Sequence, residues 1–165
     1  MDIQLLSRRY KVTNLEETDI PAIFQLCSKN PQYYRYCPPV VSVEGIREDM
    51  RALPPGKSME DKYYLGFWDG GELAAVMDLI PGYPNAEAAW IGFFMMNADM
   101  QGRGIGSGII EEVCTYLRNR FSSVHLGYVN GNRQSESFWL KNGFQPTGAV
   151  TQTVDYEIIV MKKVL

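Results

Sequence analysis

The chain has 165 residues, and its content of 45% hydrophobic and 21% charged residues is typical of a globular protein with one core. A net charge of −3 disfavours nucleic acid and anionic membrane surfaces as partners. Three cysteines without CxxC spacing and one histidine argue against a disulfide framework and a zinc site, so we expect no metal. No apolar run approaches the ~20 residues of a membrane span, and we expect no cleavable signal. We therefore expect a reduced, cytoplasmic protein with a single domain over residues 1–165.

The first part of the chain predicts one strand and two helices. Residues 8–15 alternate weakly between polar and apolar, as a strand does. Apolar residues then recur at helical spacing from Ile20 until the sequence KNP ends the helix. Residues 30–39, NPQYYRYCPP, are predicted to form an aromatic loop. Ser42 is the expected N-cap of a second helix over 43–53, which ends at PPG.

The middle of the chain predicts three strands. Residues 62–80 contain two β-rich runs joined by an Asp-Gly-Gly turn, a strong hairpin signal. A second reversal is expected at 81–86. Residues 88–97 then form an almost unbroken apolar run, which is typical of a strand covered on both faces.

The last part of the chain predicts two helices and three strands. One helix begins within a glycine-rich segment and runs to about residue 119, and another covers 132–142. Strands are expected at 123–129 and in the final region, 153–165. The predicted order is β-α-α-β-β-β-α-β-α-β-β, an α/β fold of the α+β type with a mixed, mainly antiparallel sheet.

The glycine-rich segment is residues 95–110, MMNADMQGRGIGSGII. A strand-to-helix turn that needs glycine only for its backbone angles is one interpretation. A Rossmann turn fails on spacing, because its third glycine would fall at Ser107 or Ile109. A P-loop fails because no lysine lies nearby. The spacing that remains is Gln101-x-x-Gly104-x-Gly106, directly after an apolar strand and at the start of an amphipathic helix.

A second motif follows 26 residues after Gly106. It matches Asn-x-x-(Ala/Ser)-x-x-apolar-aromatic-x-x-x-Gly-Phe at Asn132, Ser135, Phe138, Trp139, Gly143 and Phe144. An amphipathic helix that ends at a glycine C-cap is the alternative for this stretch alone. In order, spacing and context, the two motifs together resemble the GNAT superfamily of acyl-CoA-dependent N-acyltransferases. The glycine motif has a physical reason in this family. The unpaired N–H groups and the positive dipole of a helix start bind a pyrophosphate, and coenzyme A carries one.

The resemblance implies a twisted sheet flanked by four helices, with a V-shaped splay between the fourth and fifth strands. The pantetheine arm of coenzyme A would fill this gap and pair with the backbone of Met96. The amide N–H of Phe94 would face the thioester carbonyl as an oxyanion donor. The residues implied to contact acetyl-CoA or coenzyme A are Phe94, Met95, Met96, Gln101, Gly102, Arg103, Gly104, Ile105, Gly106, Ser107, Asn132, Ser135 and Trp139. Arg103 as a solvated surface residue and Asn132 as a plain N-cap remain alternatives.

The chain departs from the family pattern at the acid and base positions. Trp139 stands where many members have the tyrosine that protonates the leaving thiolate, and Trp90 where some have a glutamate base. We take Tyr128 as a candidate acid, with packing as its alternative, and Glu87 as a candidate base in preference to Asp78. A symmetric hairpin would place Asp78 opposite Ala89 and on the wrong face relative to Trp90. A slip or a bulge would reverse that parity.

The resemblance predicts an N-acetyltransferase that transfers acetyl from acetyl-CoA to a primary amine of a small molecule or peptide by direct attack on the thioester. Tyr33, Tyr34, Tyr36 and Trp90 are the candidates for lining the amine site, because aromatic faces accommodate cations. A loop that packs its own tyrosines is the alternative. A non-catalytic acyl-CoA-binding or sensor module is the alternative function, and we expect a monomer or a homodimer.

Overall fold

A computed structural model describes residues 1–165 and contains one seven-stranded sheet with five helices. The strands are β1 Lys11–Asn14, β2 Tyr63–Asp69, β3 Glu72–Pro81, β4 Ala88–Met96, β5 Ser123–Val129, β6 Gln145–Gln152 and β7 Glu157–Val164. Their order in the sheet is β1-β2-β3-β4-β5-β7-β6, and only the β4–β5 pair is parallel. The predicted mixed, mainly antiparallel sheet is confirmed.

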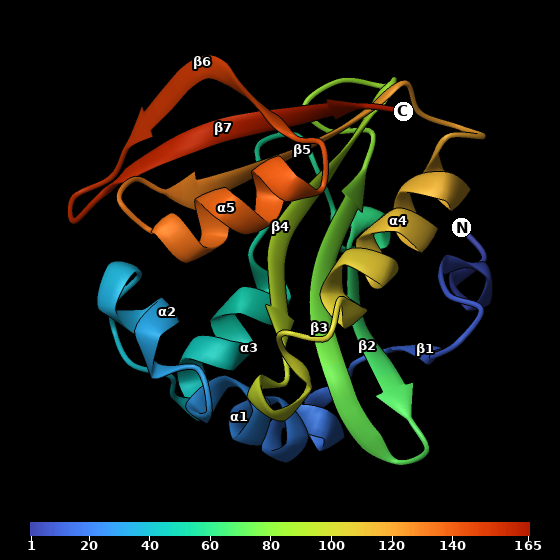
Figure 1. Cartoon of the computed structure of the whole chain (residues 1–165), viewed down its shortest axis with the longest axis vertical. Coiled ribbons are helices and arrows are strands. Elements are labelled where there is room, and N and C mark those ends of the chain that lie inside the picture. Colours follow the sequence, from blue (N-terminus) through green and yellow to red (C-terminus); the bar gives the residue numbers. More distant parts are fainter.

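The helices lie on both faces of this sheet (Figure 1). They are α1 Ile20–Ser28, α2 Pro31–Tyr36, α3 Val43–Arg51, α4 Ile105–Leu117 and α5 Arg133–Lys141. Short 3-10 turns cover Ile3–Leu6, Glu17–Asp19, Met59–Asp61 and Ala98–Met100. None of these helices is both long enough and apolar enough to cross a bilayer.

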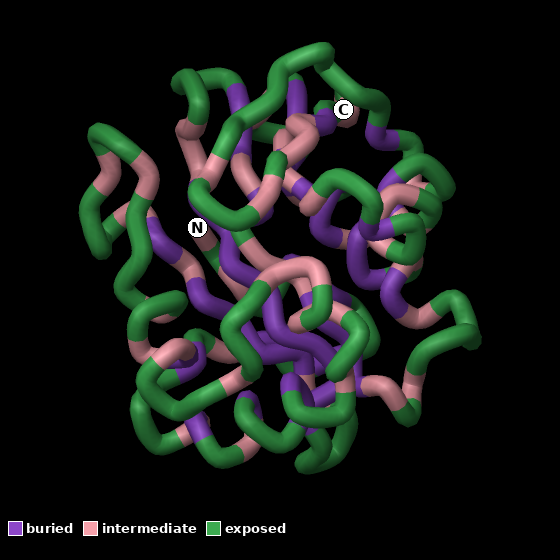
Figure 2. The backbone as a smooth tube through the Cα atoms, turned by 90° about the vertical axis from the view of Figure 1, so that its left-hand side faces the viewer, coloured by how far each residue is buried: buried purple, intermediate pink, exposed green.

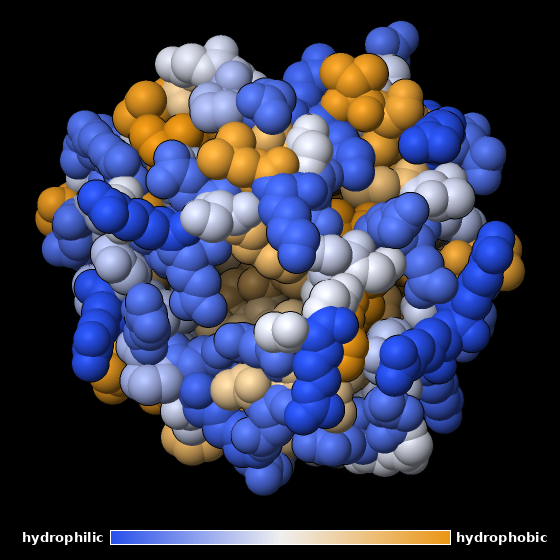
Figure 3. All heavy atoms as spheres, viewed as in Figure 1, coloured by the Kyte–Doolittle hydropathy of each residue, from blue (hydrophilic) through white to orange (hydrophobic).

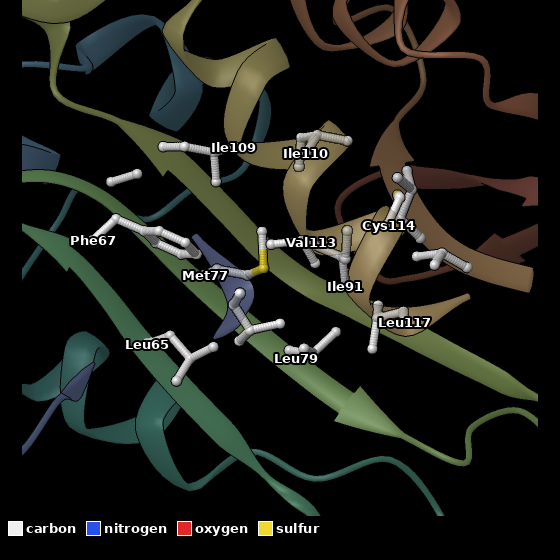
Figure 4. Packing of buried hydrophobic residues seen from close by; sticks show 14 of the residues in the cluster. Leu65, Phe67, Met77, Leu79, Ile91, Ile109, Ile110, Val113, Cys114 and Leu117 are labelled. Atoms are coloured by element: carbon white, nitrogen blue, oxygen red, sulfur yellow. The ribbon is translucent and has the colours of Figure 1, made fainter. Parts of the chain in front are cut away.

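The core has two parts, one on each face of the sheet. On one face, the apolar stripe of α4 packs on β2, β3 and β4, with Ile110, Val113 and Leu117 fully buried (Figure 4). On the other face, α1 and α3 pack on β2 and β3 through Ile23, Ile46 and their neighbours. Figure 2 shows the buried chain concentrated in the central strands and the exposed chain in the surrounding turns. The central strands are therefore covered on both sides, as the apolar sequences of β3 and β4 predict.

The aromatic segment after α1 was predicted to be a loop, but it contains a fifth helix in addition to the four that were expected. Residues 31–36 form the helix α2, which begins at Pro31 and is too short to be recognised from periodicity. Proline suits this first position because its missing N–H would be unpaired there in any case. Tyr33 packs edge-on against Tyr34 and Phe93, at ring-centroid distances of 5.1 and 5.7 Å. Tertiary packing of these rings on β4 thus holds a helix that has little intrinsic length to stabilise it.

The parallel pair of β4 and β5 opens along its length. Pairing runs from Ala88 opposite Ser123 to Ile91 opposite Leu126 and then stops. Figure 1 shows the two strands diverging beyond this point, with α5 beside the open end. The expected splay between the fourth and fifth strands is therefore present.

The hairpin of β3 and β4 contains a bulge that the sequence prediction did not place. Asp78 lies opposite Phe93, whereas the next residue, Leu79, lies opposite Ile91, so Gly92 is the extra residue. The expected pairing of Asp78 with Ala89 is wrong, because Ala89 lies opposite Pro81. The extra residue reverses the parity of β4, so Asp78, Trp90 and Phe93 all face the side of α1 and α3.

Candidate functional site

The open edge of β4 carries the first element of the site. Asn97 donates its backbone N–H to the carbonyl of Ala74 in β3, at 2.8 Å. Alternate residues of a strand direct their N–H groups to opposite sides, so those of Phe94 and Met96 point to the side where β5 has diverged. Two main-chain donors are thus available at the gap, without any contribution from side chains.

The carbonyl of Met96 accepts hydrogen bonds from two side chains that lie next to β4. It accepts hydrogen bonds from Asn30 Nδ2 at 3.0 Å and from Gln101 Nε2 at 3.3 Å. Gln101 Nε2 also donates to Asn30 Oδ1, at 2.8 Å. Gln101 therefore fixes the turn before α4 to β4 and to α2. The contribution of Asn30 was missed in the sequence, because an Asn before a proline gives no signal beyond a helix start.

The turn before α4 is built by glycines for two different reasons. Gly102 and Gly104 have φ angles of +76° and +78°, a region that side chains strongly disfavour. Gly106 is needed for space, because a Cβ there would lie 3.2 Å from both Met96 and Phe138. The first backbone N–H groups of α4 point out of the helix start, where an anion binds most favourably.

A cavity of about 310 Å³ joins this helix start to the open edge of β4. Most of the residues expected to contact coenzyme A line it, namely Phe94, Met95, Met96, Gln101, Gly102, Gly104, Ile105, Gly106, Ser107, Asn132 and Ser135. The Asn132 side chain caps α5 by accepting from the N–H of Ser135 at 3.2 Å. Lys141 also lines the cavity, and it is a cation that sequence reasoning missed. We call this space the donor cavity.

Two residues that were expected to contact coenzyme A do not line the donor cavity. Arg103 is exposed and does not line it. Trp139 is buried in the core, where its ring centroid lies 6.0 Å from that of Phe94 and 5.2 Å from that of Phe144. Trp139 therefore supports Phe94 from behind, and the prediction that it contacts coenzyme A is not supported by its position.

Glu87 is too far from the gap to act as a base. It is exposed, precedes the paired end of β4, and its carbonyl accepts from the N–H of Ser122 at 2.8 Å. Seven residues of extended strand separate it from Phe94, a distance of roughly 23 Å at ~3.3 Å per residue. The expectation for Glu87 is therefore corrected: the length of β4 places it at the wrong end.

Tyr128 lies on the open part of β5, on the side of α5. Its hydroxyl donates to Glu136 Oε1 at 3.2 Å, and burial together with this carboxylate raises its pKa. The phenol thus keeps its proton and is linked to a carboxylate of α5. Its role as the acid stays a prediction.

A second cavity, of about 460 Å³, lies on the opposite face of the sheet between the α2–α3 region and strands β3, β4 and β5. We call it the acceptor cavity. Tyr33, Tyr34 and Trp90 line it as expected, whereas Tyr36 does not. Tyr33 lines both cavities and packs against Phe93 of β4, so the two cavities share this wall beside the gap. Figure 3, viewed as Figure 1 with α4 and α5 in front, shows a hollow near the centre of the molecule, with apolar residues on its floor and hydrophilic residues around its rim.

Asp78 and Lys62 form a buried ion pair at the wall of the acceptor cavity. Lys62 Nζ donates to Asp78 Oδ2 at 2.7 Å and to the carbonyl of Ala52 at 2.8 Å. Asp78 is 8% exposed, and its Oδ1 has no hydrogen-bond partner. Its carboxylate lies over Gly92, where a Cβ would be only 2.6 Å from Oδ2. Burial raises the pKa of Asp78, an effect that Lys62 opposes.

The chain matches the model of the acetyltransferase (GNAT) family over residues 24–144, and it belongs to this family. The matched region contains the splayed strands, the glycine turn and both motifs of the donor cavity. No curated protein sequence matches the chain.

Solved structures show the same fold. An acetyltransferase from Thermus thermophilus superposes with a TM-score of 0.75 at 19% identity, over 93% of this chain and 96% of that one. An acetyltransferase from Salmonella typhimurium, which modifies the N-terminal serine of a 50S ribosomal subunit protein, has a TM-score of 0.75 at 20% identity, over 97% of each chain. The PaiA N-acetyltransferase of Thermoplasma acidophilum, solved in complex with coenzyme A, has a TM-score of 0.67 at 15% identity, over 93% and 98%.

Proposed function

We propose that this chain is an N-acetyltransferase that transfers acetyl from acetyl-CoA to a primary amine of a small molecule or peptide. The observation that carries the proposal is that two cavities on opposite faces of the sheet lie beside the open edge of β4 and share Tyr33 as a wall. One has the features of a phosphate-binding site and the other those of an amine-binding site. An acyl group placed in the gap would be reached from both sides.

The donor cavity suits acetyl-CoA through its main chain. The pyrophosphate would lie at the start of α4 against the N–H groups of Ile105, Gly106 and Ser107, with Lys141 as the nearby cation. The pantetheine arm would pair with the N–H of Met96 in the gap. The thioester oxygen would then face the N–H of Phe94, and removal of such a donor costs enzymes ~3–4 kcal/mol.

The acceptor cavity suits a positively charged molecule. Its lining contains three carboxylates, on Glu48, Asp49 and Asp78, and no lysine or arginine. Aromatic rings line it as well, and their faces attract cations. An amine would therefore enter as an ammonium ion and would need a base before it could attack.

We propose Asp78 as this base, in place of Glu87. Its free Oδ1 would take one proton from the ammonium ion, directly or through one water, and the nitrogen lone pair would then attack the thioester carbon. The C–N bond forms while the carbonyl electrons move to the oxygen at Phe94. When the tetrahedral intermediate collapses, the C–S bond breaks and the thiolate takes a proton from Tyr128 or from water. The nitrogen gives up its second proton to solvent, which restores the phenol of Tyr128 and leaves a neutral amide.

The experiment is a free-thiol release assay with acetyl-CoA and a panel of amines, polyamines and peptides. The proposal predicts coenzyme A release and acetylated product with at least one primary amine. Acetyl-CoA binding without product for any member of the panel would instead support the alternative, a non-catalytic acyl-CoA-binding or sensor module. The monomer or homodimer and the cytoplasmic location stay predictions.

A further inference from the structure

The charges of the acceptor cavity do not balance within the protein. Three carboxylates line it, and the nearest buried ammonium group, that of Lys62, is held by Asp78. The Lys62 side chain is 1% exposed, and its ammonium group is held by Asp78 and by the carbonyl of Ala52. Two negative charges of the cavity therefore remain without a cation from the chain.

Asp49 carries one of these charges in an aromatic setting. It lies on α3, faces the cavity and makes no hydrogen bond or ion pair with another side chain. Although Asp49 is exposed, partial desolvation by the surrounding protein raises its pKa, and Lys62 opposes this effect. Burial raises the pKa of Tyr33, Tyr34 and Tyr64, and Asp49 is close enough to raise all three further. A carboxylate among aromatic rings is a typical binding site for an organic ammonium ion.

One of these rings, that of Tyr64, already contacts a cation within the protein. Lys62 Nζ lies 5.6 Å from the centroid of the Tyr64 ring while it bonds Asp78. An ammonium ion at Asp49 would meet the same kind of surface on the cavity side.

Asp78 provides the second and independent position. Its Oδ1 is buried and lacks a partner. Asp78 lines the cavity beside Gly92, two residues before Phe94, with its Oδ2 over Gly92. An unpartnered buried carboxylate oxygen is costly unless a ligand completes it. No three His, Cys, Asp or Glu side chains are grouped as a metal site requires, so an organic cation fits better than a metal ion.

We propose, on the basis of the proposed function, that the acceptor is a diamine with a primary amine that reacts beside Asp78 and a second cationic nitrogen that Asp49 holds among the tyrosines. An apolar segment joins the two nitrogens, since most residues that line the cavity are hydrophobic. The second charge selects the substrate, and the first is lost in the reaction.

The test compares 1,4-diaminobutane with its isostere 1-aminopentane, which lacks only the second charge. Calorimetry in the presence of coenzyme A measures binding without turnover, and the thiol-release assay measures kcat and KM with acetyl-CoA. We expect the diamine to bind at least tenfold more tightly, since hydrogen bonds to charged groups contribute ~1.5–3 kcal/mol. Asp49→Asn should reduce this preference to within about twofold, whereas Asp69→Asn, at the exposed end of β2 and outside both cavities, should keep it.

The outcomes separate this proposal from the proposed function. Equal binding and equal kcat/KM for diamine and monoamine, or an Asp49→Asn variant that keeps the preference, would overturn the proposal while leaving acetyl transfer intact. Selective binding of the diamine with no acetylated product would support the dication site and contradict the catalytic function. The tripeptide Ala-Lys-Ala, compared with Ala-norleucine-Ala, forms a second arm. A preference for the lysine peptide that Asp49→Asn abolishes would support the same charge requirement with a peptide as its source.

Discussion

The two cavities on either side of β4 are built from different chemical groups, main-chain groups in the donor cavity and side chains in the acceptor cavity. The donor cavity relies on main-chain N–H groups and on glycines that leave the helix start accessible. The acceptor cavity relies on carboxylate and aromatic side chains that come from residues as distant as Tyr33 and Tyr156. A substitution can therefore damage the acceptor side directly, whereas the largest changes on the donor side require a new side chain that alters the backbone or its field.

The largest expected effect is on the acceptor side, at Asp78. We expect Asp78→Asn to lower kcat by ~10²–10⁴-fold, because the amide cannot take the amine proton. Acetyl-CoA affinity should stay within about twofold, since the donor cavity does not contain Asp78. Steady-state kinetics and calorimetry measure the two quantities, and thermal unfolding checks that the amide oxygen still accepts from Lys62. Wild-type kcat in a folded Asp78→Asn protein would exclude Asp78 as the base.

The next largest effect is expected on the donor side, at Gly104. Gly104→Glu places a side chain at φ +78° and a negative charge at the helix start that binds phosphate. Strain of ~1–2 kcal/mol and the lost dipole interaction of ~1–2 kcal/mol together weaken acetyl-CoA binding about a hundredfold.

The matched control for Gly104 is Gly108→Ala, in the same helix. A Cβ at Gly108 meets no neighbouring atom, so affinity should be unchanged and the helix more stable by ~0.5–1 kcal/mol. Calorimetry with acetyl-CoA measures both variants. Intact binding by Gly104→Glu would mean that coenzyme A does not use the start of α4.

A smaller effect is expected when the ion pair beneath the acceptor cavity is removed. Lys62 lowers the pKa of Asp78 against the effect of burial. Lys62→Met should therefore raise that pKa further and move the acidic limb of kcat/KM upward by about one pH unit or more. Lys62→Arg should leave the limb near its wild-type position. A limb that does not move in Lys62→Met would show that the limb reports another group.

The same substitution has a consequence for stability. A carboxyl group whose pKa is higher in the folded than in the unfolded protein holds its proton longer when folded. The unfolding free energy of Lys62→Met should therefore fall as the pH rises from the ordinary aspartate pKa through the raised folded value. Denaturant unfolding at several pH values measures this slope, and a free energy that rises over that window would contradict the assignment.

The smallest effect distinguishes two exposed cations near the glycine turn. Lys141 lines the donor cavity and Arg103 does not. We expect Lys141→Met to weaken acetyl-CoA binding two- to fivefold, and less so at high salt, as for other exposed charge interactions. Arg103→Met should change it by less than twofold. The reverse order in calorimetry would indicate that the turn, and not α5, supplies the phosphate cation.

The sequence predicted the donor cavity well because its signals are local. Glycine spacing, an apolar strand and a helix start occur within residues 95–110, and they define the turn that the structure contains. The short helix α2 escaped prediction because six residues carry too little periodicity to reveal it. Trp139 and Arg103 do not line the donor cavity, and the motif could not predict this because it does not say whether a side chain turns toward the core or toward solvent.

The acceptor cavity could be predicted only in part, because its geometry depends on a single extra residue. The bulge at Gly92 places Asp78 on the face of Trp90, and no sequence pattern fixed its position. The pairing of Lys62 with Asp78 follows from the register of β2 and β3, and Asp49 and the tyrosines converge because α2 and α3 pack on the same face of the sheet. The sequence suggested tyrosines and a buried aspartate, and the fold brought them together.

The placement of donor and acceptor on opposite faces of β4 is tested most directly by a crystal structure with a bisubstrate analogue. In this analogue, coenzyme A is joined through an acetyl bridge to 1,4-diaminobutane. We predict the pyrophosphate at the first turn of α4 and the bridging carbonyl oxygen within hydrogen-bond distance of the Phe94 N–H. The amine chain should lie on the other face of β4, between Asp78 and Asp49. Both halves of the analogue on one face of the sheet, or a carbonyl oxygen directed away from Phe94, would contradict this arrangement.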